Sequence, residues 1–168
     1  MIEARARIDT GPLAVIDAGT AVTLDVLDAS GQHRGGLILP GLQAQIQGLR
    51  VTVPGLGDAL AGLMTEGAPS DHSADVVPEA TRRLGLAVDT TTALDLGRHW
   101  LLAAGINEML AVWREALAEE GELIAVIAGG DAERLAALID PSMDVRRESG
   151  LVLDGIVRLS KARRQGAA

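Results

Sequence analysis

The chain has 168 residues, 48% of them hydrophobic, and a formal net charge of −8 from 23 acidic and 15 basic residues. This length and composition suit one buried core, so we expect a single domain over residues 1–168. The acidic balance disfavours binding to nucleic acid or to a membrane surface, because either requires a positive field. The lack of Cys excludes disulfides, and the three His residues lack the spacing of a zinc site.

Hydropathy and aromatic content narrow the class of protein further. The sequence has no run of 18 apolar residues and no signal-peptide core near its start, so we expect a cytoplasmic protein. Phe and Tyr do not occur, and Trp100 and Trp113 are the only aromatic residues. The core is therefore expected to consist of Leu, Val, Ile and Ala.

The first quarter of the chain predicts three strands joined by tight turns. An apolar β-branched run at 13–17 ends in Asp17 and a glycine turn, and residues 21–27 alternate between polar and apolar. Turn-forming residues then separate this segment from a third strand at 35–39. Three consecutive strands with such short connections predict an antiparallel three-stranded meander.

The remainder of the chain mixes helical and strand patterns. Helical periodicity or helix-start signals occur in six segments, at residues 42–49, 59–64, 79–84, 91–120, 132–139 and 151–163.

Two more strands and one long connection complete the predicted order. The fully apolar segment 123–128 is typical of the centre of a parallel sheet, and 143–147 is expected as an edge strand. Residues 51–78 are rich in Gly, Pro, Asp and Ser and predict a loop or insertion that carries the short helix near 59–64. The fold class is therefore α/β, a mixed sheet with flanking helices.

Some helical details stay open at this stage. Gly97 and Gly105 fall inside the longest helical pattern, where they either permit close packing or divide it into two helices. The last helix is expected to turn Leu153, Ile156, Val157 and Leu159 inward.

The sharpest candidate site is Asp17-Ala-Gly-Thr-Ala-Val-Thr-Leu-Asp25. A strand brings a carboxylate to the sheet edge, and the turn at Gly19 and Thr20 then exposes backbone N–H groups and a hydroxyl. Such groups suit a nucleotide phosphate, with Asp17 holding a cation beside it. An ordinary hairpin turn explains the same residues about equally well.

Three further patterns are weaker when taken singly. Gly35-Gly36…Pro40-Gly41 indicates either a ligand or tight strand packing. Gly129-Gly130-Asp131 follows a predicted parallel strand, where α/β sheets bind ligands, but a plain strand-to-helix connection also fits. Asp89-Thr90-Thr91-Thr92 supplies a helix N-cap, with a hydroxyl left over for a substrate contact.

Together these pieces resemble the type III pantothenate kinase family, also described as Bvg accessory factor-like. The resemblance rests on five motifs in the family's order, at Asp17–Asp25, Gly35–Gly41, Thr90…Ala93…Gly97, Gly129–Asp131 and Leu151–Gly155. It covers about residues 11–159, and the first two motifs in combination are the specific part. It implies the C-terminal half of the enzyme, a ribonuclease H-like lobe of the actin, sugar kinase and Hsp70 superfamily.

The resemblance also implies a reaction and roles for single residues. The family phosphorylates pantothenate with ATP in coenzyme A biosynthesis, uses Mg²⁺ and a monovalent cation (K⁺ or NH₄⁺), and forms homodimers. By position, Asp17 would bind the monovalent cation, and Gly19, Thr20, Gly129 and Gly130 would bind ATP. A further threonine, Thr90, would contact pantothenate in the neighbouring subunit's site.

The sequence also departs from the family pattern. The family's N-terminal lobe carries an Asp-Xaa-Gly-Asn phosphate loop and a Gly-Xaa-Asp-Arg motif with the catalytic base, and residues 1–16 contain neither. We therefore expect this lobe to be inactive alone, since phosphoryl transfer requires positioning from both lobes. Two alternatives remain: a non-catalytic homologue acting as dimer scaffold, nucleotide binder or accessory regulator, and an unrelated small α/β domain.

Overall fold

A computed structural model describes residues 2–8, 11–61, 63, 86–151 and 153–158. In this part of the chain, one mixed sheet has the strand order β3-β2-β1-β4-β5. Its strands are β1 (Leu13–Ala18), β2 (Ala21–Leu27), β3 (His33–Pro40), β4 (Ile124–Ala128) and β5 (Asp144–Arg147).

Strand directions bring the ends of several strands to one side of the sheet. β1 and β2 are antiparallel, as are β2 and β3, whereas β4 runs parallel to both β1 and β5. β1, β3, β4 and β5 therefore all end at the same side, which we call the carboxyl edge. The predicted meander and α/β class are confirmed, and this arrangement is that of the ribonuclease H-like lobe.

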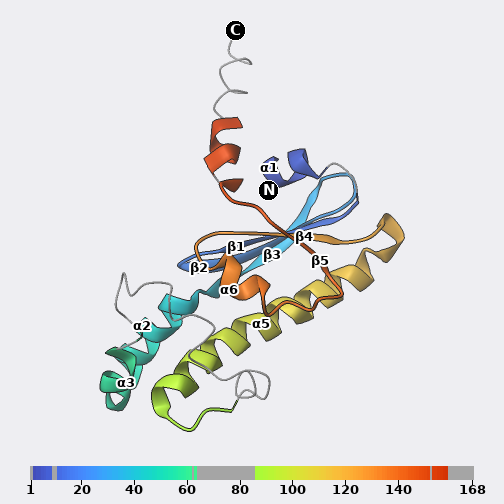
Figure 1. Cartoon of the computed structure of the whole chain (residues 1–168). Coiled ribbons are helices and arrows are strands. Elements are labelled where there is room, and N and C mark those ends of the chain that lie inside the picture. The colour runs from blue at the N-terminus through green and yellow to red at the C-terminus, as the bar shows by residue number, and fades with distance from the viewer. Residues whose placement is uncertain (1, 9–10, 62, 64–85, 152, 159–168) are drawn as a thin grey trace.

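Helices cover both faces of the sheet (Figure 1). The face below the sheet in that view carries α2 (Leu42–Thr52), α3 (Gly57–Ala61), α5 (Thr90–Ala116) and α6 (Ala132–Ala136). The opposite face carries α1 (Ile2–Arg7) and the carboxyl-terminal helix, which comprises residues 151 and 153–158. Short 3₁₀ turns are η1 (Pro54–Leu56) and η2 (Ala118–Glu120). Among these helices, none has both the length and the apolar character that a membrane crossing requires.

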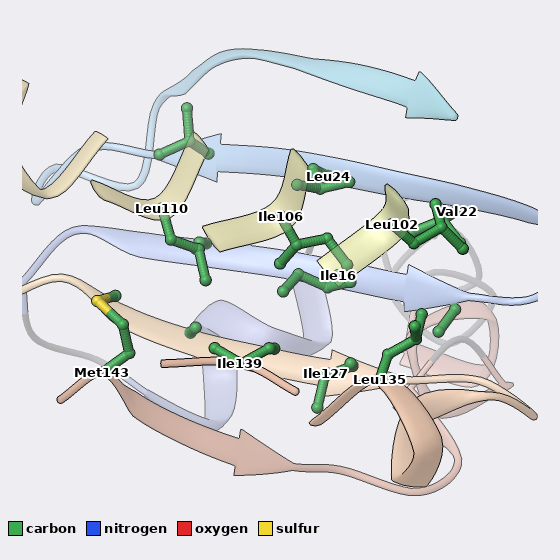
Figure 2. Packing of buried hydrophobic residues seen from close by; sticks show 14 of the residues in the cluster. Ile16, Val22, Leu24, Leu102, Ile106, Leu110, Ile127, Leu135, Ile139 and Met143 are labelled. Atoms are coloured by element: carbon green, nitrogen blue, oxygen red, sulfur yellow. The ribbon is translucent and has the colours of Figure 1, made fainter. Parts of the chain in front are cut away.

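The main core lies between α5 and the sheet. Leu102, Ile106 and Leu110 of α5 are buried at steps of four residues, the spacing that puts them on one helix face. Figure 2 shows this row packed over Ile16 and Leu24 of the meander. α5 is one continuous helix of 27 residues, so the glycines inside the pattern do not divide it.

A second core joins α1 to the opposite face of the sheet, and α1 was not predicted. Ala4 and Ile8 pack with Leu13 and Val15 of β1 and with Leu151 of the carboxyl-terminal helix. These contacts give the first residues of the described chain a defined place against the sheet.

Ion pairs tie α1 to the carboxyl-terminal helix. Glu3 accepts from Arg158 at 2.6 Å and from Arg7 at 3.2 Å, and Arg7 also pairs with Asp154 at 2.6 Å and with Glu148. The hydrogen bond from Arg158 is the main cause that lowers the pKa of Glu3 below its usual range. The charged network thus fixes the two helices side by side.

The expectation for the last helix was wrong in its orientation. Leu153 and Ile156 are 69% and 58% exposed, and Val157 is also exposed. The helix instead faces α1 with Leu151 and the charged residues Asp154 and Arg158, which follow at steps of three and four. The ion pairs set the orientation of the carboxyl-terminal helix, and the periodicity of apolar residues gives no information about ion pairs.

The expected loop at 51–78 is partly helical where the structure describes it. α2 continues to Thr52, and η1 and α3 follow without a long gap. The rest of this loop, the expected helix at 79–84 and Leu159 lie outside the described residues.

Candidate functional site

Three chain reversals meet at the carboxyl edge. They are the β1–β2 turn at Gly19–Thr20, the β3–α2 junction at Pro40–Gly41 and the β4–α6 turn at Gly129–Gly130. Backbone hydrogen bonds link them, because Gly41 N donates to Thr20 O at 3.0 Å and Asp131 N donates to Ala18 O at 3.0 Å. The central turn is thus held on both sides by backbone.

Two glycines make this close approach possible. A Cβ at Gly41 would lie closer than 3.0 Å to the carbonyl oxygens of Gly19 and Thr20. A Cβ at Gly129 would collide equally with the backbone of Ala18, and Gly129 also has φ of +101°. Both glycines are therefore required by backbone packing around the Gly19–Thr20 turn, whatever else binds there.

Two backbone donors at the edge remain open. Thr20 and Gly130 belong to no helix or strand. Neither backbone N–H donates to a carbonyl oxygen of the described residues. Thr20, Gly129 and Gly130 are all exposed to solvent. The two turns therefore offer N–H groups and a threonine hydroxyl to a ligand, and such clustered donors suit an anion.

Asp17 supplies a carboxylate next to these donors. Alternation along β1 places it on the same face as Leu13 and Val15, one residue before the strand ends, and its register partner across β2 is Thr23. Its side chain is half-buried and has no ion-pair partner within the described chain. A carboxylate in this position is available to a cation.

The metal-binding capacity of the site is limited. No group of three His, Cys, Asp or Glu side chains able to hold a metal occurs among the described residues. One carboxylate with nearby carbonyls fits a weakly bound monovalent cation, and Mg²⁺ fits when nucleotide phosphates provide the other oxygens. The residues present are compatible with both ions on those terms.

Thr90 does not join this group within one chain. It is the first residue of α5, and the side chain of Asp89 caps the helix by accepting from Thr92 N at 2.9 Å. That hydrogen bond is the main cause that lowers the pKa of Asp89. Thr90 precedes Leu102 by twelve residues, which is about 18 Å along the helix axis, so α5 carries it well beyond the carboxyl edge.

One of the paired glycines of β3, Gly36, is explained by strand packing. Gly36 lies opposite Asp25, and a Cβ there would come within 2.7 Å of the Asp25 carboxylate. Asp25 in turn contacts His33 Nε2 at 2.9 Å. Tight strand packing thus accounts for Gly36, in agreement with one of the two interpretations of this pattern.

Sequence reasoning missed one charged residue whose side chain is largely buried, Arg98 of α5. It lies one helical turn before the core residue Leu102, and its side chain is 9% exposed. A lone Arg in a helical pattern predicts a surface position, and only the packing of α5 shows that this side chain is largely covered.

Comparison with known proteins identifies the lineage of the chain. The sequence model described as "Type III pantothenate kinase" matches residues 1–112. The chain belongs to the type III pantothenate kinase family. Similar relatives with that name come from Synechococcus elongatus, 31% identical over 151 residues, and Rhodopirellula baltica, 33% identical over 157 residues.

The chain spans about half the length of these type III pantothenate kinases. The alignments cover 90% and 94% of this chain but 53% and 50% of the two relatives. A solved structure described as a putative Baf family transcriptional activator from Campylobacter jejuni has a TM-score of 0.52 at 23% identity. That match covers 98% of this chain and 63% of the other, and it supports the fold alone.

Proposed function

We propose that this chain is the C-terminal, nucleotide-binding lobe of a cytoplasmic type III pantothenate kinase, acting in ATP-dependent phosphorylation of pantothenate for coenzyme A biosynthesis. The observation that carries the proposal is the carboxyl edge. There the Gly19–Thr20 and Gly129–Gly130 turns present open donors beside Asp17. Family membership supports the reaction class.

Different residues of the carboxyl edge bind different parts of the ATP phosphates and their counter-ion. The amides of Thr20 and Gly130 and the Thr20 hydroxyl donate to phosphate oxygens, and Gly19 and Gly129 let the backbone come close. Asp17 holds K⁺ or NH₄⁺ beside the phosphates and offsets their charge. Mg²⁺ bound by the phosphates would neutralise charge that develops during phosphoryl transfer.

The isolated lobe is proposed to bind nucleotide without turning it over. Its sequence contains no Gly-Xaa-Asp-Arg motif, so no residue here is assigned as catalytic base. Loss of a general base alone costs about 10²–10⁴-fold in rate. A non-catalytic role as dimer scaffold, nucleotide binder or accessory regulator is the second candidate.

The family's homodimer is proposed for this chain as well. Trp100 and Leu101 of α5 are 41% and 66% exposed. Exposing adjacent large apolar side chains to water is unfavourable in an isolated subunit, and contact with a second subunit would cover them. Thr90 lies far along the same helix, so pairing through α5 offers a way for it to reach pantothenate in the partner's site.

Calorimetric titration of ATP–Mg²⁺ in K⁺ buffer tests the proposal. Wild-type chain is expected to bind, and Asp17→Asn is expected to weaken binding roughly tenfold or more, because a charge-assisted contact is lost. Replacing K⁺ with tetramethylammonium should weaken the wild type to a similar degree and leave Asp17→Asn unchanged.

Asp144→Asn provides the matched control. It makes the same change of charge at the opposite edge of the sheet, where Asp144 pairs with Arg146 at 3.0 Å. Its ATP affinity should equal that of wild type. No binding by either protein would remove the nucleotide site from this lobe. Equal affinities in the wild type and Asp17→Asn would remove Asp17 from that site.

A further inference from the structure

The Arg98 side chain is largely buried, with 9% of its surface exposed, and it has an unused donor. Its Nε donates to Asp95 Oδ1 at 2.9 Å, and its Nη2 donates to the same oxygen. Its Nη1 is buried and has no hydrogen-bond partner within the described chain. Buried N–H groups are nearly always paired, so an unpaired one indicates an acceptor that the described residues do not supply.

The charge on Arg98 cannot be relieved by losing a proton. A guanidinium stays protonated in proteins, unlike a buried Lys or His. Asp95 neutralises one side of the Arg98 guanidinium and fixes its orientation. His99 Nδ1 lies 2.7 Å from the Asp95 carbonyl oxygen and 3.7 Å from the Asp95 carboxylate. The side that carries Nη1 is left without a counter-charge among these neighbours.

The position of Arg98 connects it to the carboxyl edge. Figure 2 shows Leu102 next to Val22 at the end of the sheet where β1 terminates, with Leu110 at the other end. Arg98 is four residues before Leu102, so it lies about 6 Å farther along the helix in the same direction. It therefore occupies the helix layer just past the edge.

Helix α2, which neighbours α5, also connects this helix layer to the carboxyl edge. α2 packs against α5 in this layer and begins directly after Gly41. Gly41 is the residue whose backbone rests on the Gly19–Thr20 turn. The guanidinium thus lies in the layer that borders the candidate site on its helix-covered side.

We propose that Arg98 is an oxyanion-binding residue of this site, with Nη1 donating to a phosphate or carboxylate oxygen of a ligand at the carboxyl edge. Both groups match a guanidinium donor in charge and geometry. The identity of the ligand rests on the proposed function, as a phosphate of ATP or the carboxylate of pantothenate. The presence of an anion site does not depend on catalysis.

The first experiment measures anion binding by thermal unfolding of the full chain. Inorganic phosphate and acetate are titrated separately at constant ionic strength, against wild type, Arg98→Gln and Arg98→Lys. At least one anion should stabilise the wild type, and Arg98→Gln should raise its dissociation constant at least about tenfold. Arg98→Lys should lie between them, because it keeps the charge but loses the planar fork.

Arg114→Gln is the matched control on the same helix. Arg114 contacts Ser142 and the sulfur of Met143, at the end of α5 away from the site. It should bind the anion as wild type does. The inference is overturned when neither anion stabilises the wild type, or when Arg98→Gln binds as tightly as the wild type.

NMR of the Arg98 guanidinium in wild-type protein keeps the test decisive if Arg98→Gln does not fold. A shift with ATP–Mg²⁺ but not with pantothenate assigns the anion as phosphate, and the reverse assigns it as carboxylate. An unchanged Arg98 signal with both ligands, and with inorganic phosphate and acetate, contradicts the inference. Asp17-dependent ATP binding with an unmoved Arg98 signal would leave the proposed function standing and remove this inference alone.

Discussion

Gly129→Ala is expected to lower the free energy of unfolding by roughly 2–5 kcal/mol. The new Cβ would be placed closer than 3.0 Å to the backbone of Ala18, at a φ of +101° that L residues rarely adopt. Relief of this clash requires the β1–β2 turn to separate from the β4–α6 turn. Urea denaturation of the purified variant measures the loss.

The neighbouring glycine supplies the control. Gly130 has no atom within 4 Å of the position that a Cβ would take, and its φ lies outside the strained range. Gly130→Ala is expected to change stability by less than about 0.5 kcal/mol, as an exposed substitution does. Equal stability losses in the two variants would show that the two turns are not packed as described.

Ile106→Ala is expected to cost about 2–5 kcal/mol of unfolding free energy. Ile106 is fully buried at the middle of the α5 row, between Leu102 and Leu110, and packs over the meander (Figure 2). Its truncation leaves a cavity that the surrounding β-branched and leucine side chains fill only partly. Chemical denaturation at a fixed temperature gives the value.

Leu101→Ala is the control for the core prediction. Leu101 lies on the same helix but is 66% exposed, so its truncation should cost about 0.5 kcal/mol or less in an isolated subunit. A large cost at Leu101 that depends on protein concentration would instead indicate that this face is buried between subunits. A small cost at Ile106 would contradict the packing of α5 on the sheet.

Local patterns predicted much of the fold. Alternation and turn residues between Leu13 and Leu39 were sufficient to predict the meander, because each strand pairs with the next along the chain. The fully apolar segment at 123–128 predicted a central parallel strand for the same kind of local reason. The Asp17 motif and the Gly129–Gly130 turn were also found from sequence, and strand directions then explain why they meet.

Contacts between distant segments could not be predicted in this way. Glu3 and Arg158 are separated by 155 residues, so nothing near either one indicates the pair that orients the last helix. The low exposure of the Arg98 side chain likewise depends on tertiary packing around α5, which the neighbouring sequence does not indicate. Two glycines were recognised as a pattern, but only the structure shows that Gly41 and Gly129 contact the same turn.

Backbone amide NMR with increasing ATP–Mg²⁺ tests the central claim most directly, because it reports on the two open donors themselves. Saturable shifts of the Thr20 and Gly130 amide signals with one dissociation constant are expected, and these shifts should be larger than those of residues at the opposite edge such as Asp144. Binding that shifts other amides while leaving Thr20 and Gly130 unchanged, or no binding, would contradict a nucleotide phosphate site at the carboxyl edge.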